Sequence, residues 1–86
     1  MSVLEQLAAP ARVDELIQRN GKVEGSLLGI NGNAFSVVGH VASLLKKGGW
    51  PRADIDEYQK FMFAGSYDEL LYIGAQALEH PLGEEQ

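Results

Sequence analysis

The sequence contains no cysteine in its 86 residues, and it has no apolar run near the roughly 18 residues that a membrane span requires. Without cysteine, the chain can form neither a disulfide framework nor the usual thiolate zinc site. The opening residues do not place an apolar segment after a basic one, as a secretory signal peptide does. We therefore expect a cytoplasmic protein that crosses no membrane and carries no metal or other cofactor.

Basic residues are also scarce: seven Lys and Arg stand against twelve Asp and Glu, for a net charge of −5. Nucleic acid is thus a poor default partner, because phosphates are bound by clustered Lys and Arg. The hydrophobic content of 45% is that of a globular protein. A chain of this length is too short for two domains, so the composition predicts a single small domain over residues 1–86.

Residues 1–21 predict a helical extension. The opening residues have the pattern of a capping box, and Pro10 suits the first turn of a helix but not its interior. We expect one short helix near residues 3–8 and another near residues 11–20. Gly21 would end the second helix.

Residues 22–80 predict a core of one short strand followed by three helices. Apolar and polar side chains alternate between residues 22 and 30, which favours a strand over a helix. A turn signal, Asn31-Gly32, comes next. Three helical patterns follow, over residues 34–47, 51–63 and 66–80. The fold class is therefore mainly α with a minor β component, and residues 81–86 form a flexible tail.

Two of these helices have clear starts. Asn33 is placed to cap helix 34–47, and Ser66 forms a capping box with Glu69 ahead of the last helix. The spacing of apolar residues also predicts which sides face the core. Ile55, Tyr58 and Met62 form the inner stripe of helix 51–63, and Phe35 widens the apolar face of helix 34–47.

Several motifs lie between residues 23 and 71: Gly29-Ile30-Asn31-Gly32-Asn33-Ala34-Phe35, Leu44-Leu45-Lys46-Lys47-Gly48-Gly49-Trp50, Ile55-Asp56-Glu57-Tyr58 and Gly65-Ser66-Tyr67-Asp68-Glu69-Leu70-Leu71. This set resembles a group of small uncharacterised proteins of bacterial and bacteriophage genomes, which carry a Gly-Asn-Ala-Phe turn and a Gly-Asp-Tyr-Asp-like turn. Ser66 stands where the group often has Asp, which preserves a cap. The resemblance implies the order strand, helix, helix, helix, and it implies no activity.

Candidate catalytic residues are few. His40 and His80 stand alone, and we expect both to be surface residues, since a catalytic or metal site needs converging partners. A candidate anion site is the turn formed by Gly29, Asn31, Gly32 and Asn33. Its backbone N–H groups could face an anion, as in other glycine-rich turns before helices. The alternative is that the glycines supply unusual dihedral angles and that Asn33 caps the helix.

The candidate interaction surface consists of Trp50, Phe61, Met62 and Phe63. The last three are consecutive, and a helix cannot point three neighbours toward one core. At least one of them must be exposed or covered by a partner, and aromatic and Met side chains are enriched at interfaces. The alternative is a core that the N-terminal helices complete.

We expect a small acidic interaction or regulatory module that binds another protein and is not an enzyme. One alternative is a helical nucleic-acid-binding domain, because helices 51–63 and 66–80 have the lengths of a helix-turn-helix. Charge opposes it, since the segment from Tyr67 to His80 contains acidic residues and no Lys or Arg. A second alternative is an acidic inhibitor or mimic protein, which the seven basic residues disfavour.

A lone strand over residues 22–30 would leave both of its edges unpaired. The simplest solution is a homodimer in which two copies of this strand pair about a two-fold axis. The alternative is a monomer in which residues 13–20, or the chain after Asn31-Gly32, pair with the strand.

Overall fold

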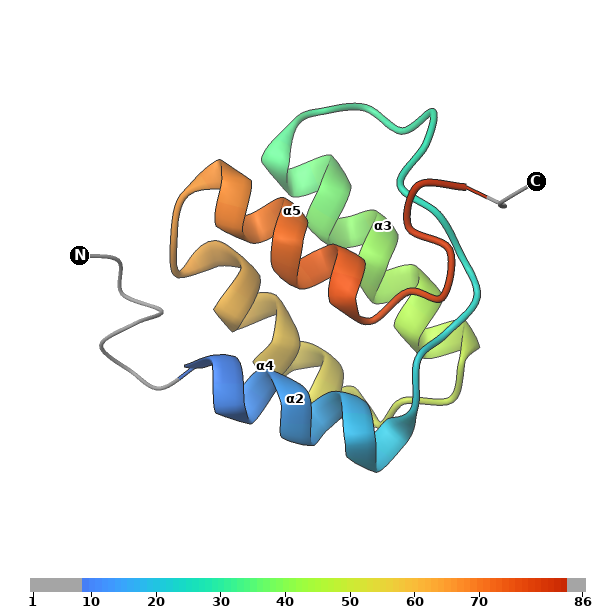
Figure 1. Ribbon diagram of the computed structural model, residues 1–86, viewed down its shortest axis with the longest axis vertical. Coiled ribbons are helices and arrows are strands. Elements are labelled where there is room, and N and C mark those ends of the chain that lie inside the picture. The colour runs from blue at the N-terminus through green and yellow to red at the C-terminus, as the bar shows by residue number, and fades with distance from the viewer. Residues whose placement is uncertain (1–8, 84–86) are drawn as a thin grey trace.

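The computed structural model describes residues 9–83, and within them the chain is mainly helical, which confirms the predicted class. The helices are α2 (Ala9–Asn20), α3 (Ala34–Lys47), α4 (Arg52–Phe63) and α5 (Tyr67–Gln76). In Figure 1, α5 lies between α3 and α4, and α2 lies against α4. The helix expected near residues 3–8 and the tail residues 84–86 lie outside the described residues. No helix in the described part of the chain is long and apolar enough to span a membrane.

Both predicted helix caps are confirmed. The Asn33 side chain accepts hydrogen bonds from the backbone N–H groups of Phe35 (2.8 Å) and Ser36 (3.4 Å) at the start of α3. The Ser66 hydroxyl accepts from the Glu69 N–H, and the Glu69 carboxylate accepts from the Ser66 N–H, which completes the capping box of α5. These bonds satisfy donors that a helix start otherwise leaves free.

The strand predicted over residues 22–30 is wrong. Among the described residues, the β pairing is an isolated parallel bridge between Val23 and Leu78. The glycine in the middle of the alternating pattern, Gly25, has a φ of +152°. A side chain there would also collide with α3, because an added Cβ would lie 2.4 Å from a methyl group of Leu44. The alternation therefore belongs to a close-packed linker between α2 and α3, residues 21–33, and not to a continuous strand.

The linker finds its backbone partners in the chain that follows α5. The Val23 N–H donates to the Ala77 carbonyl (2.9 Å), and the Glu79 N–H donates to the Val23 carbonyl (3.0 Å). Further along, the Leu27 N–H donates to the Pro81 carbonyl (2.8 Å). Figure 1 shows these two segments side by side. The homodimer was predicted because residues 22–30 would need a second copy to pair with. Residues 77–81 of the same chain supply these hydrogen bonds, so that reason for a dimer does not apply.

The same contact explains why the last helix is shorter than expected. The pattern predicted a helix to residue 80, but α5 ends at Gln76. Beyond it, the backbone turns so that Leu78 is buried beside Val23. The Tyr58 hydroxyl donates to the Ile73 carbonyl near this end of the helix. Tertiary contacts therefore override a local pattern that would have continued the helix.

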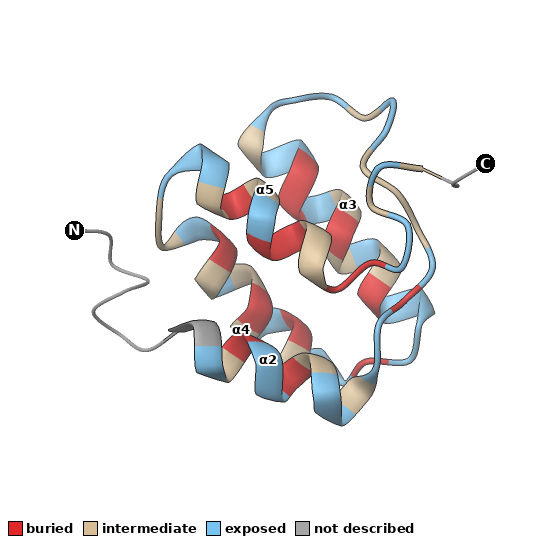
Figure 2. Cartoon of the chain, viewed as in Figure 1, coloured by how far each residue is buried: buried red, intermediate tan, exposed pale blue. Residues whose placement is uncertain are grey.

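The core lies where the four helices meet (Figure 2). The predicted inner stripe of α4, consisting of Ile55, Tyr58 and Met62, is buried as expected. The Trp50 ring packs edge-on against Tyr58, with centroids 5.4 Å apart, and its indole N–H donates to the Gly21 carbonyl (2.9 Å). The polar atoms of the two large aromatic core residues are thus satisfied.

Candidate functional site

Two aromatic rings meet on the surface where α3 begins and α4 ends. Phe35 is 76% exposed and Phe63 is 45% exposed, yet their ring centroids lie only 5.4 Å apart, with the planes tilted by 48°. The exposed Tyr67 lies close by, because its hydroxyl donates to the carbonyl of Gly32, just before α3. We call Phe35, Phe63 and Tyr67 the aromatic end of the molecule.

The four residues of the predicted interaction surface separate in the structure. Trp50 is only 4% exposed and Met62 is fully buried, so both belong to the core. Phe61 is half-buried against that core. Phe63 is the member of the consecutive trio that reaches the surface. One helix therefore points its three neighbours in different directions, as its geometry requires.

At the predicted anion site, the protein's own side chains take up backbone donors. The Asn33 N–H donates to the Asn31 side chain (2.8 Å), and the Asn33 side chain accepts from the next helical N–H groups. The Gly32 carbonyl accepts from Tyr67. The turn thus has the bonding of a capped helix start, which is the second of the two interpretations of its sequence.

The two histidines do not come together. His40 is half-buried and its Nε2 lies 2.7 Å from the Ser26 carbonyl, so it ties α3 to the linker. His80 is exposed beyond the end of α5. Within residues 9–83, no group of three His, Asp or Glu side chains is arranged to hold a metal ion.

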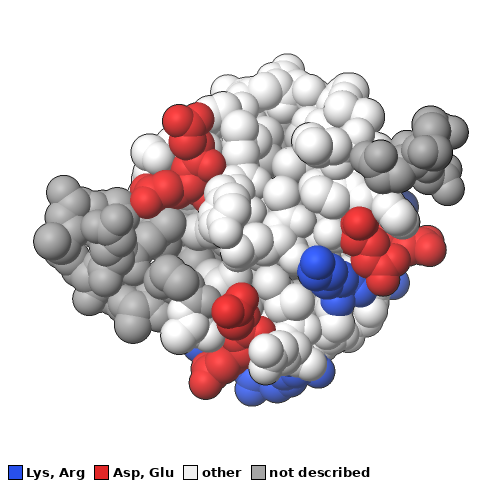
Figure 3. Space-filling view, viewed as in Figure 1, with Lys and Arg blue, Asp and Glu red and all other residues white. Residues whose placement is uncertain are grey.

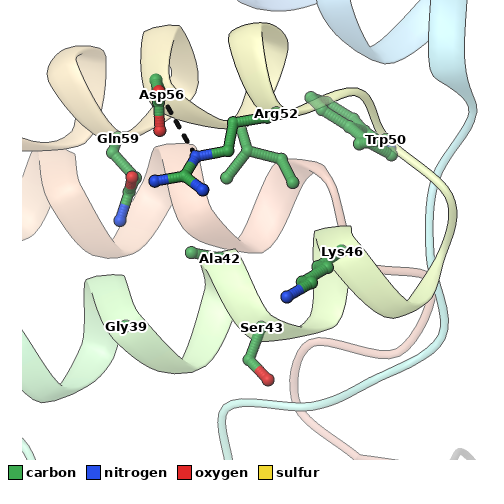
Figure 4. Close-up of a pocket in the computed structure, with 9 residues that line it drawn as sticks. Gly39, Ala42, Ser43, Lys46, Trp50, Arg52, Asp56 and Gln59 are labelled. Carbon is green, nitrogen blue, oxygen red and sulfur yellow. Dashed lines mark ion pairs between the residues drawn. The ribbon is translucent and has the colours of Figure 1, made fainter.

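A groove follows α3 and α4 along their outer sides. Its first part has a volume of about 470 Å³ and is lined by Gly39, Ala42, Ser43, Lys46, Trp50, Arg52, Ile55, Asp56 and Gln59. Figure 4 shows the Arg52 side chain running beside α4 toward Asp56 and Gln59, with Ser43 and Lys46 on the α3 side. A second hollow of about 530 Å³ shares Asp56 and Gln59 with the first and continues to Lys60 and Phe63. We call the two together the α3–α4 groove.

The groove results from matched spacing on two antiparallel helices. Along α3, Phe35, which contacts Phe63, is followed by the lining positions 39, 42 and 46; along α4, the lining positions are 52, 56, 59 and 63. Steps of four, three and four residues keep each set on one side of its helix. Phe35 contacts Phe63 at one end, and Lys46 and Arg52 line the groove at the other. This matched spacing is present in the sequence, but the motifs considered one at a time did not predict the groove.

Arg52, one of the cations of the groove, is loosely held. The Arg52 side chain is 91% exposed, and its Nε lies 3.9 Å from Asp56, the limit of an ion pair. By contrast, Arg12 donates two hydrogen bonds to Glu57, of 2.6 and 2.8 Å. These bonds hold the pKa of the Glu57 carboxyl below its ordinary value and raise that of Arg12. The tight ion pair therefore fastens α2 to α4, whereas Arg52 can turn toward another group.

A scan against protein-family models, a search of curated proteins and a search of solved structures found no match to the chain.

Proposed function

We propose that the chain is a small protein-interaction module that acts by binding a partner protein at its aromatic end. The observation that supports this most directly is the surface contact between Phe35 and Phe63. Burying a Phe side chain gains about 1.5–3 kcal/mol relative to leaving it in water. A partner that covers both rings would gain this energy without first having to bring the rings together.

The size of the aromatic end supports the same proposal. From the exposed fractions of Phe35, Phe63 and Tyr67, and about 200 Å² for each side chain, it presents about 300 Å² of surface. A patch of this size is at the scale of the largest apolar patch on a typical monomer, which is often functional. Aromatic side chains are also enriched among the residues that dominate binding energies.

Charge favours a protein over a nucleic acid as the partner. The helix that would enter a DNA groove, α5, carries Asp68 and Glu69 in its first turn and no Lys or Arg. These carboxylates would repel phosphates. Aromatic side chains on the surface are instead enriched at protein–protein interfaces.

The proposal is tested by affinity capture from a lysate of the source cell, with mass spectrometry of the captured proteins. The wild type is compared with a Phe35→Ser/Phe63→Ser variant. Both rings are exposed, so the double variant is expected to fold, as circular dichroism will show. The control is Tyr72→Ser, because Tyr72 is 67% exposed but lies outside the Phe35–Phe63 contact.

We expect the wild type and the Tyr72 variant to capture the same specific protein and the double variant to lose it. Equal capture by all three proteins would refute a role for the aromatic end.

A further inference from the structure

We propose that the α3–α4 groove receives a short acidic segment of the partner protein. An apolar side chain of that segment would pack on Phe35 and Phe63, and its carboxylates would pair with Lys46 and Arg52. The inference rests on the proposed function and adds the chemistry of the partner. It follows from the length, the shape and the charge of the groove.

The length of the groove limits the occupant to a short segment. Arg52 and Phe63, which line its two ends, are eleven residues apart on α4, which corresponds to about 16 Å along the helix axis. That distance is about three turns of a helix or about five residues of an extended chain. A segment with one apolar anchor and a carboxylate two or three helical turns away would span it.

On the α3 side of the groove, small residues allow the backbone of the bound segment to approach closely. A Cβ added at Gly39 would meet no atom within 4 Å, so the space beside this residue is open. Ala42, one turn further on, is also small and lines the same hollow. Longer side chains line the two ends, with Phe63, which contacts Phe35, at one and Lys46 at the other. The middle of the groove therefore has room for a backbone, and its ends carry the side chains that would contact a bound segment.

The charge of the groove is opposite to that of the whole chain. Three cations, Lys46, Arg52 and Lys60, and one carboxylate, Asp56, line its two parts. The chain as a whole has twelve acidic and seven basic residues. An acidic segment would therefore be attracted to the groove and repelled elsewhere, which would direct it to this site.

Arg52 is also suited to bind a carboxylate. Its guanidinium presents two parallel N–H donors, the geometry in which arginine binds carboxylates most strongly. It is nearly fully exposed, and its present contact with Asp56 is long. Lys46 is exposed on the facing helix and lines the same end of the groove. The two can therefore bind a carboxylate from both sides.

The partner segment is identified by selecting binders of the full chain from a random library of linear peptides of about 16 residues. We expect the selected peptides to combine acidic residues with one or two large apolar ones. The tightest peptide is then synthesised, its Kd is measured, and its site is mapped by amide chemical shifts in ¹⁵N-labelled protein. The largest shifts are expected around Gly39, Ala42 and Ser43.

Two matched double variants test the charge. Lys46→Glu/Arg52→Glu should weaken binding of the selected peptide at least about tenfold, because two favourable pairs become repulsive. Lys22→Glu/Lys47→Glu changes the net charge equally, but these residues line a different hollow. It should change the Kd less than about twofold. A third variant, Gly39→Leu, fills the open space and should also abolish binding, whereas Gly39→Ala should not.

The inference is overturned if no peptide is selected, if the selected peptides are basic or uncharged, or if both double variants weaken binding equally. It is also overturned if the shifts map to α5, or if an oligonucleotide binds the groove and displaces the peptide. These failures are distinguishable from failure of the proposed function. Loss of capture by the Phe35→Ser/Phe63→Ser variant would uphold the interaction module even where the acidic segment is refuted.

Discussion

Gly39 lies in the middle of α3 and has open space where a side chain would be. Glycine in a helix interior costs about 0.5–1 kcal/mol relative to alanine, because it loses more conformational freedom on folding. We therefore expect Gly39→Ala to raise the free energy of unfolding by about 0.5–1 kcal/mol. Urea unfolding with an unchanged m-value would show this. A lower stability would mean that the space beside Gly39 is not open.

Tyr58 links stability to alkaline pH. Its hydroxyl is buried and donates to the Ile73 carbonyl, and burial, assisted by the charge of Asp14, raises its pKa above the ordinary value of 10.0. A raised pKa means that the unfolded chain loses this proton first. The contribution of Tyr58 is therefore complete below about pH 10 and decreases as the pH rises through the folded-state pKa.

We expect Tyr58→Phe to cost about 1–3 kcal/mol at neutral pH, because it leaves the Ile73 carbonyl without this partner. The variant should also lose stability less steeply than the wild type above about pH 10. Urea unfolding of both proteins at several pH values measures the two effects. Parallel pH profiles would contradict the role given to this hydroxyl.

Phe35 shows where residue patterns stop being informative. Its spacing predicts that it widens the apolar face of α3, but it is 76% exposed. The spacing of apolar residues shows which side of a helix carries an apolar stripe. It does not show how far the neighbouring helices extend over that stripe. α4 ends at Phe63, and the exposed ring of Phe63 lies beside Phe35. The sequence therefore predicted the exposed member of the α4 trio, Phe63, within a larger candidate set, but not its contact with Phe35.

At the scale of elements, α2 is fastened to α4 by polar groups at the edge of an apolar contact. Arg12 pairs with Glu57, and the Asn20 side chain donates to Asp54 (2.8 Å). Val13 and Leu16 of α2 are buried beneath these pairs. A helix held in this way is a candidate for local opening before global unfolding.

Acid should release this contact first. The Arg12 hydrogen bonds lower the pKa of Glu57 below its ordinary value of 4.5. Its contribution is therefore present above about pH 4.5 and is lost as the pH falls through the lowered pKa. On acidification, we expect the amides of α2 to lose protection from hydrogen exchange before the amides of α5 do. In the Glu57→Gln variant, the α2 amides should lack this protection already at neutral pH. Arg12→Lys, which cannot form both bonds, is the matched variant. Equal pH responses of α2 and α5 would contradict this expectation.

The elements that could be predicted are those specified by neighbouring residues. The start of α3 is specified by Asn33, which bonds the N–H groups two and three residues ahead, and the start of α5 by Ser66 and Glu69. The linker could not be predicted in this way, because its partners lie more than fifty residues away. An alternating pattern does not show whether its backbone will be paired by a strand or by a passing segment.

Charge is distributed unevenly over the molecule. On the side where α5 lies, much of the surface is uncharged, and both acidic and basic groups lie around this area (Figure 3). The α3–α4 groove carries three cations and one carboxylate. An acidic chain can therefore bind an acidic partner, because the local charge of a site and the net charge of a protein are separate quantities.

We expect the free protein to be a monomer. A stable interface buries about 800 Å² on each partner, whereas the aromatic end offers about 300 Å². The unpaired strand that would favour a dimer does not form in the described residues. Light scattering at tens of micromolar should give the mass of one 9.4 kDa chain. A mass of two chains across that range would contradict this expectation.

The pairing of Val23 with Leu78 also bears on how the protein is made. A ribosome releases the chain from its N-terminal end, so Val23 emerges long before Ala77, Leu78 and Glu79, which bond it and cover it. Until residue 79 has cleared the exit tunnel, the linker has none of these partners. Nascent chains stalled before this point should be cut by protease within the linker, and chains carried well past it by an added C-terminal extension should resist.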